Sequence, residues 1–130
     1  MKVKYSDLKN KRVFITGGGS GIGASIVEHF CEQESEVYFV DINVKDSKKL
    51  ISVLNKKKFK TPKFIECNLL DVQKLQKIIK KIISTKGPIH SLVNNAANDE
   101  RHTTEEVNEK YYENRMAINL KHYFFAAQEA

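Results

Sequence analysis

Short apolar runs alternate along the chain with longer segments in which apolar residues recur every three or four positions. The short runs are rich in β-branched and aromatic side chains, which indicates buried strands. Four strands are predicted, at 12–16, 36–41, 63–67 and 91–94. Helical spacing predicts helices at 22–31, 46–57 and 71–86, a short helix capped by Thr103 or Thr104, and a long final helix that starts near Glu109.

The predicted helix at 71–86 has the clearest boundaries. Asp71 stands at its start, where a carboxylate can accept a hydrogen bond from a free backbone N–H group. Gly87 and Pro88 follow its last residue, as is common after a helix. Between them the apolar residues form one stripe, made of Val72, Leu75, Ile78, Ile79, Ile82 and Ile83.

Strict alternation of strands and helices predicts βαβ units, and therefore a parallel sheet with helices on both faces. The predicted fold is α/β, a Rossmann-like doubly wound sheet with its four strands in the order 3-2-1-4. The 130 residues have the size of one domain. The fourth strand is expected to be an open apolar edge of the sheet, which native proteins normally cover.

Composition narrows the function classes. The net charge of +6 comes mostly from lysine, and a basic chain can bind nucleic acid. We favour the alternative of solvated helix faces, because the lysines alternate with apolar residues and no aromatic residues interleave to stack on bases. No apolar run is long enough to span a bilayer, and residues 1–7 lack the apolar centre of a secretory signal. We therefore expect neither a nucleic acid nor a membrane partner. We expect the protein to be cytoplasmic.

The cysteines and histidines show no metal-ligand spacing. Cys31 and Cys67 form no Cys-x-x-Cys pair and are expected to be free, mostly buried thiols. No metal site is predicted.

A glycine-rich loop, Thr16-Gly17-Gly18-Gly19-Ser20-Gly21-Ile22-Gly23, joins the first strand to the first helix. Such a loop lets the backbone approach a pyrophosphate, which then meets the N–H groups and positive dipole end of the helix. Asp41 ends the second strand, 24 residues after Gly17, where a carboxylate would accept hydrogen bonds from an adenosine ribose. Its charge would repel a 2′-phosphate and no Arg stands beside it, so NAD is favoured over NADP. The alternative is a flexible glycine turn with an exposed Asp, which the matching context disfavours.

The spacing T-G-x-x-x-G-x-G resembles that of the short-chain dehydrogenase/reductase family, and further motifs extend the resemblance over residues 12–130. Asn94-Asn95-Ala96-Ala97 is similar to that family's N-N-A-G, with Ala97 in place of the glycine, and Asn119 lies in a similar Ala-Ile-Asn-Leu segment. The resemblance implies a pyrophosphate lined by Gly17, Ser20, Gly21, Ile22 and Gly23, a ribose bound by Asp41, an adenine flanked by Asn68 and Leu69, and a nicotinamide-side ribose next to Asn95 and Ala96.

The resemblance also implies hydride transfer between the nicotinamide and an alcohol or carbonyl carbon. In the family a Tyr acts as general acid/base with a Lys four residues later, and a Ser orients the substrate oxygen. These follow the long helix and are absent from this chain, so we expect the catalytic half to be missing and the 130 residues to be inactive alone. Asn119 is implied to kink the long helix and to help position the catalytic lysine. Without the resemblance, Asn119 would be a satisfied core residue bonded to a carbonyl, and Tyr112 and Tyr123 would be packing residues of the helix face.

The polar loop at 98–102 resembles that of aldose (galactose-type) dehydrogenases within the family. Its Arg101 and His102 could hold a sugar by hydrogen bonds. A solvated surface loop is the alternative, and the sequence leaves both open. For the whole protein, the resemblance implies an alcohol or carbonyl substrate and a homo-oligomer. The competing hypothesis is a non-catalytic nucleotide-binding module whose open sheet edge pairs with a partner.

Overall fold

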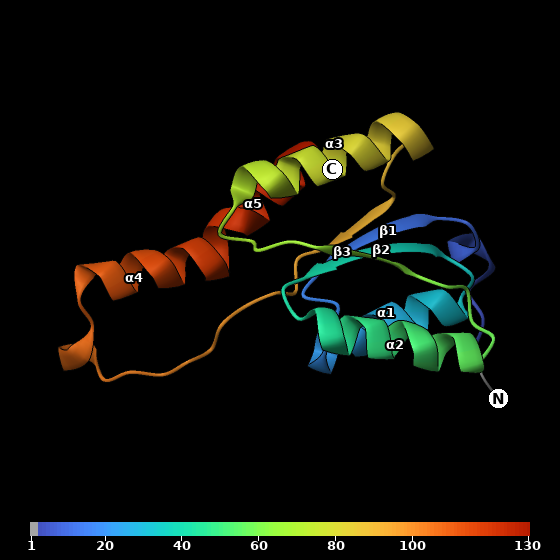
Figure 1. The fold of residues 1–130 in the computed structure, drawn as a ribbon. Coiled ribbons are helices and arrows are strands. Elements are labelled where there is room, and N and C mark those ends of the chain that lie inside the picture. The colour runs from blue at the N-terminus through green and yellow to red at the C-terminus, as the bar shows by residue number, and fades with distance from the viewer. Residues whose placement is uncertain (1–2) are drawn as a thin grey trace.

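Four parallel strands form one sheet in the computed structural model, which describes residues 3–130. Met1 and Lys2, which begin the segment 1–7 that lacks the apolar centre of a secretory signal, lie outside the described residues. The strand order β3-β2-β1-β4 confirms the prediction (Figure 1). The strands are β1 (Arg12–Thr16), β2 (Glu36–Asp41), β3 (Lys63–Glu66) and β4 (Ser91–Val93).

Helices cover both faces of the sheet. Helices α1 (Gly21–Glu32) and α2 (Val44–Lys56) lie on one face, and α3 (Val72–Lys86) and α5 (His122–Glu129) lie on the other (Figure 1). Right-handed crossovers between parallel strands place successive helices in this way. Because all four strands run parallel, their carboxyl ends lie at a common edge of the sheet, where the loops that follow them meet.

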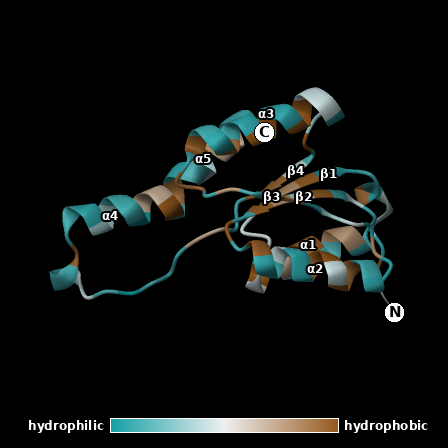
Figure 2. Cartoon of the chain, in the orientation of Figure 1, coloured by the Kyte–Doolittle hydropathy of each residue, from teal (hydrophilic) through white to brown (hydrophobic). Residues whose placement is uncertain are grey.

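Alternation along the strands supplies both halves of the core. Phe14 of β1 points toward α3 and α5, whereas its neighbours Val13 and Ile15 point toward α1 and α2. All three are fully buried, and burying a side chain of this kind contributes about 1.5–3 kcal/mol. Figure 2 shows the same pattern, with apolar strands between helices whose outer surfaces are hydrophilic.

Side-chain caps set the starts of α2 and α3. The Asp71 carboxylate accepts a 2.9 Å hydrogen bond from the Lys74 N–H, so the predicted cap is confirmed. Gly87, at φ +93°, ends α3 as predicted. The predicted start of α2 at Asp46 is wrong, because the Asn43 side chain caps the helix from three residues earlier by accepting from the Asp46 N–H.

The final helix is interrupted. It consists of α4 (Glu109–Met116), a π-helical turn η3 (Ala117–Lys121) and α5, and α4 projects beyond the sheet (Figure 1). Two short 3-10 turns complete the described chain, η1 (Ser6–Leu8) and η2 (Thr104–Glu106). Thr103 precedes η2, but its side chain makes no capping hydrogen bond.

Cys31 and Cys67 are buried free thiols, as predicted. Burial raises the pKa of the Cys31 thiol to about 12, so this thiol stays protonated. Within residues 3–130, no helix is long and apolar enough to cross a membrane. The same residues contain no group of three or more His, Cys, Asp and Glu side chains that could hold a metal ion.

Candidate functional site

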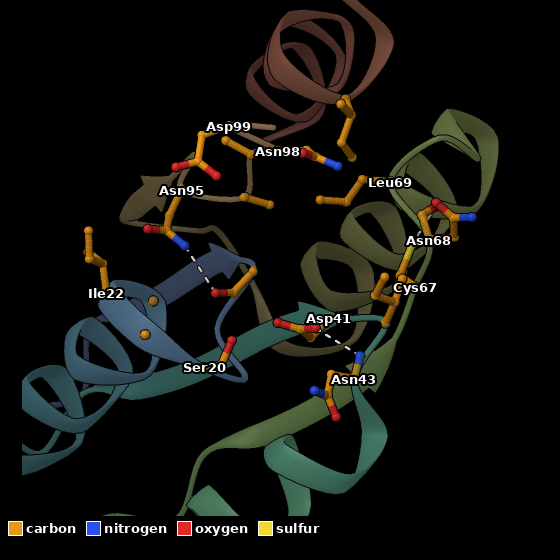
Figure 3. A pocket seen from close by; sticks show the side chains of 17 residues that line it. Ser20, Ile22, Asp41, Asn43, Cys67, Asn68, Leu69, Asn95, Asn98 and Asp99 are labelled. Atoms are coloured by element: carbon orange, nitrogen blue, oxygen red, sulfur yellow. Dashed lines mark hydrogen bonds between the residues drawn. The ribbon is translucent and has the colours of Figure 1, made fainter. Parts of the chain in front are cut away.

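A cavity of about 670 Å³ opens at the carboxyl ends of the strands (Figure 3). Its size lies within the range of pockets that hold small molecules and cofactors. All ten residues that the sequence assigned to the cofactor line it, although they come from four separate segments of the chain. Further lining residues that those assignments missed are Ile42, Asn43, Cys67, Ala97, Asn98, Asp99 and Ile118. Each of these lies within two positions of an assigned residue or in the segment after β4, and that proximity is the signal that could have found them.

The glycine loop forms the floor of the cavity. Gly17 has a φ of +68°, and a Cβ atom on Gly23 would lie 1.8 Å from the Gly17 carbonyl oxygen, so this turn has no space for a side chain at Gly23. Gly21 has a φ of +53° with open space where a side chain would be. The loop leads directly into α1, whose first N–H groups have no acceptor within the helix. Glycine backbone and helix N-terminus together make a surface that suits a phosphate group.

The Asp41 carboxylate is fixed at one side of the cavity. Its Oδ2 accepts a 2.8 Å hydrogen bond from the Gly19 N–H, and its Oδ1 accepts one of 2.8 Å from the Asn43 N–H. Both donors are neutral backbone groups, so they orient the carboxylate without cancelling its charge. Each oxygen keeps a lone pair for a further donor. A ribose diol would be such a donor.

Asn95 joins the glycine loop to the segment that follows β4. Its Nδ2 donates to the carbonyl oxygens of Thr16 and Gly17, at 3.1 and 3.0 Å. In return, the Thr16 hydroxyl accepts from the backbone N–H groups of Asn95 and Ala96. These four bonds hold the Asn95–Ala96 turn against the end of β1. Ala97, which replaces the glycine expected in this turn, lines the cavity beside it.

Asn119 lies in the π-helical turn and is bonded to the loop rather than to the core. Its Oδ1 accepts from the Asn98 N–H at 2.8 Å, and its Nδ2 donates to the Asn98 carbonyl at 3.0 Å. The helix therefore departs from α geometry at the residue where a kink was expected. Turns of this kind occur frequently at functional sites. Ile118, the residue before Asn119, lines the cavity.

Arg101 and His102 are not brought to the cavity. The His102 ring packs edge-on against Tyr111, and its Nε2 lies 3.5 Å from the Glu100 carboxylate. Arg101 is exposed. The same loop instead places Asn98 and Asp99 at the cavity, and the assignment of Arg101 and His102 to a substrate remains a prediction.

The cavity wall carries two carboxylates, Asp41 and Asp99, and no Lys or Arg is among its lining residues. Asp99 lies on the side of the cavity formed by Asn95, opposite the side that includes Asn68 (Figure 3). Cys67 lies beneath Asn68, and burial raises the pKa of its thiol. A protonated thiol is a poor nucleophile, so the cavity offers binding groups rather than a reactive cysteine.

Comparison with known proteins agrees with this arrangement. The sequence model of the short chain dehydrogenase family matches residues 11–130. The chain is 37% identical over 125 residues to the probable galactose dehydrogenase of Rhizobium meliloti, and 40% identical over 124 residues to the D-xylose 1-dehydrogenase of Caulobacter vibrioides. These matches cover 96% and 95% of this chain but only 49% and 48% of the relatives, so the chain spans about half their length.

A solved structure supports the same grouping. The short-chain dehydrogenase/reductase of Serratia marcescens aligns over 95% of this chain and 50% of its own, with a TM-score of 0.86 and 29% identity. The family match, the relatives and the structural alignment cover nearly the whole of residues 11–130. The chain belongs to the short chain dehydrogenase family.

Proposed function

We propose that this chain is the cofactor-binding part of an NAD-dependent short-chain dehydrogenase that oxidises an alcohol, or reduces the corresponding carbonyl, on a small polyhydroxylated substrate. The observation that supports this most is the placement of the Asp41 carboxylate. This carboxylate lies beside the glycine loop and accepts a hydrogen bond from the Gly19 N–H. The first residues of α1 line the same cavity. A pyrophosphate and an adjacent ribose require these two features side by side.

The choice of NAD rests on charge. A 2′-phosphate would stand next to Asp41, and the cavity wall supplies no cation to offset the repulsion. When bound, NAD would supply the hydride acceptor. The chain's own residues would bind the two halves of the dinucleotide, with Asp41, Asn68 and Leu69 at the adenosine and Asn95 and Ala96 at the nicotinamide-side ribose.

An aldose is the proposed substrate class. The relatives named as galactose and D-xylose dehydrogenases support it, as does the polar composition of the loop after β4. Asp99 lines the cavity and has no hydrogen-bond or ion-pair partner among residues 3–130, so its carboxylate is free to accept from a hydroxyl group. Arg101 and His102 would join it only after the loop rearranges.

The catalytic Ser, Tyr and Lys are proposed to come from sequence outside these 130 residues, because the relatives are about twice as long. Residues 1–130 would then be a partial dinucleotide-binding domain, inactive by itself. Asn119 would act there as a positioning residue. We further propose a cytoplasmic homo-oligomer. A non-catalytic nucleotide-binding module is the competing interpretation, and it differs in lacking any turnover.

The test uses the full chain as its gene encodes it. NADH and NADPH are titrated separately by nucleotide fluorescence, and oxidation of galactose and xylose is then followed by the appearance of reduced cofactor. We expect NADH to bind at least tenfold more tightly than NADPH, a difference of about 1.4 kcal/mol. Turnover of either aldose with NAD supports the enzyme. Binding without turnover of any aldose or simple alcohol would favour the nucleotide-binding module, and tighter binding of NADPH would refute the role given to Asp41.

A further inference from the structure

The carbonyl oxygen of Ala96 accepts two side-chain hydrogen bonds from the last helix. The Tyr123 hydroxyl donates to it at 2.9 Å, and the His122 Nε2 lies 3.1 Å from it. His122 is fully buried, and the two rings pack edge-on with their centroids 4.4 Å apart. Two adjacent residues of α5 therefore bond the same backbone oxygen, which lies 26 positions before His122 and 27 before Tyr123.

The bond to His122 shows which ring nitrogen carries a hydrogen. A carbonyl oxygen can only accept, so Nε2 must carry the hydrogen. Burial lowers the pKa of His122, which keeps the ring neutral and leaves Nδ1 without a proton. Nδ1 is buried without a hydrogen-bond partner among the described residues. The backbone carbonyls of Ala96 and Ile118 oppose the effect of burial on this pKa without reversing it.

The Ala96 peptide groups are held from two sides. Its N–H donates to the Thr16 hydroxyl at 3.1 Å, and its C=O is held by His122 and Tyr123. A Cβ atom on Gly17 would lie only 2.8 Å from the Ala96 Cα, so the turn already touches the glycine loop. The contact with Gly17 blocks movement of Ala96 in that direction. If the hydrogen bonds from α5 are lost, we therefore expect Ala96 to move away from Gly17 and to widen the end of the cavity assigned to the nicotinamide.

We infer that His122 and Tyr123 are positioning residues, which fix the Ala96 carbonyl and thereby set the width of the nicotinamide end of the cofactor cavity. This inference rests on the proposed function, because it takes the Ala96 side of the cavity as the nicotinamide side. It assigns to α5 a part in cofactor binding, although no side chain of α5 is among the residues that line the cavity. It also predicts an effect confined to one half of the dinucleotide, because the Asp41 carboxylate is held by the Gly19 and Asn43 N–H groups and not by α5.

The test compares the affinities for NADH and for ADP, which carries only the adenosine half. The full chain as its gene encodes it is prepared as wild type, Tyr123→Phe, His122→Gln and His122→Met. Tyr123→Phe removes one hydroxyl and keeps the ring. His122→Gln can place an amide N–H near the position of Nε2, whereas His122→Met has similar length and no donor, so these two form a matched pair.

We expect Tyr123→Phe and His122→Met each to weaken NADH binding by roughly five- to tenfold, the usual effect of one lost hydrogen bond. ADP binding should stay within about twofold, and His122→Gln should recover most of the NADH affinity. Unchanged NADH affinity in Tyr123→Phe, or an equal loss of NADH and ADP, would overturn the inference. Should His122→Met fail to fold, Tyr123→Phe decides alone. Wild-type protein that binds ADP but not NADH would refute this inference, whereas binding of neither would refute the proposed function itself.

Discussion

The backbone N–H of Gly19 donates a 2.8 Å hydrogen bond to Oδ2 of Asp41. The bond joins the glycine loop after β1 to the last residue of β2. It requires a close approach, since a Cβ atom on Gly19 would lie 3.0 Å from that same oxygen and 2.5 Å from the Ser47 hydroxyl. The position of the acidic residue and the absence of a side chain in the loop are thus two parts of one contact.

Gly19→Ala should therefore displace Asp41. The added methyl group must push away a strand residue and a buried helix residue, and overpacking of this kind costs typically about 1–3 kcal/mol. Urea denaturation would measure the loss in free energy of unfolding, and an NADH titration should show weaker binding. The control is the same change in a Ser47→Ala background, which removes the nearer clash and should recover part of the stability. A Gly19→Ala protein with wild-type stability would contradict the close contact.

Asp41→Ala should alter cofactor preference. Removing the carboxylate removes both the ribose acceptor and the repulsion of a 2′-phosphate, so the ratio of NADH to NADPH affinity should fall by about tenfold or more. Glu66→Gln is the matched control, because Glu66 pairs with Asp41 across β2 and β3 but does not line the cavity. An equal change in both variants would mean that general charge, rather than the Asp41 site, sets the preference.

The sequence predicted the site best where one short segment carries it. The glycine loop and Asp41 lie at the ends of adjacent strands, so their meeting follows from the parallel sheet alone. The path of the loop after β4 could not be predicted in the same way, because the Asn119 side chain holds Asn98 from 21 positions away. The loop held in this way has Asn98 and Asp99 at the cavity, whereas Arg101 and His102 are not among the residues that line the cavity.

The last helix shows a second limit of the sequence. Tyr123 was expected to be a packing residue, and its ring does pack, but its hydroxyl also reaches the Ala96 carbonyl. Tyr112 was expected to pack as well, and it is 58% exposed. Apolar spacing predicts which face of a helix is buried, whereas the target of a hydroxyl depends on a backbone group far away in sequence. The π-helical turn likewise has no marker in the apolar spacing.

Stability should fall as the pH drops through the His122 transition. The pKa of the buried ring is lowered in the folded state, so below the ordinary pKa of about 6.5 the unfolded chain binds a proton that the folded chain does not. The free energy of unfolding therefore decreases with acidity until the folded-state pKa is reached. Urea denaturation at pH 7.5 and pH 5.5 would measure the decrease, and His122→Gln should show a smaller one. Equal decreases in both proteins would assign the pH dependence to other groups.

The exposed apolar residues of the last helix predict self-association. Tyr112, Met116, Leu120 and Phe124 recur every fourth position and are 58, 39, 54 and 64% exposed, which is unusual for large apolar side chains close together. We expect the full chain to be a dimer or larger by light scattering, and Phe124→Glu to lower the mass with unchanged circular dichroism. Lys121→Glu, at an exposed polar neighbour, should leave the mass unchanged. A wild-type monomer at micromolar concentration would contradict the prediction.

A crystal structure of the full chain grown with NADH tests the central claim most directly. The account predicts a dinucleotide in the cavity at the carboxyl ends of the strands, with its pyrophosphate at the start of α1. The adenosine ribose hydroxyls should lie within hydrogen-bond distance of Asp41, and the nicotinamide end should lie on the Ala96 side. A dinucleotide bound elsewhere, or bound in this cavity with its adenosine ribose away from Asp41, would contradict the account.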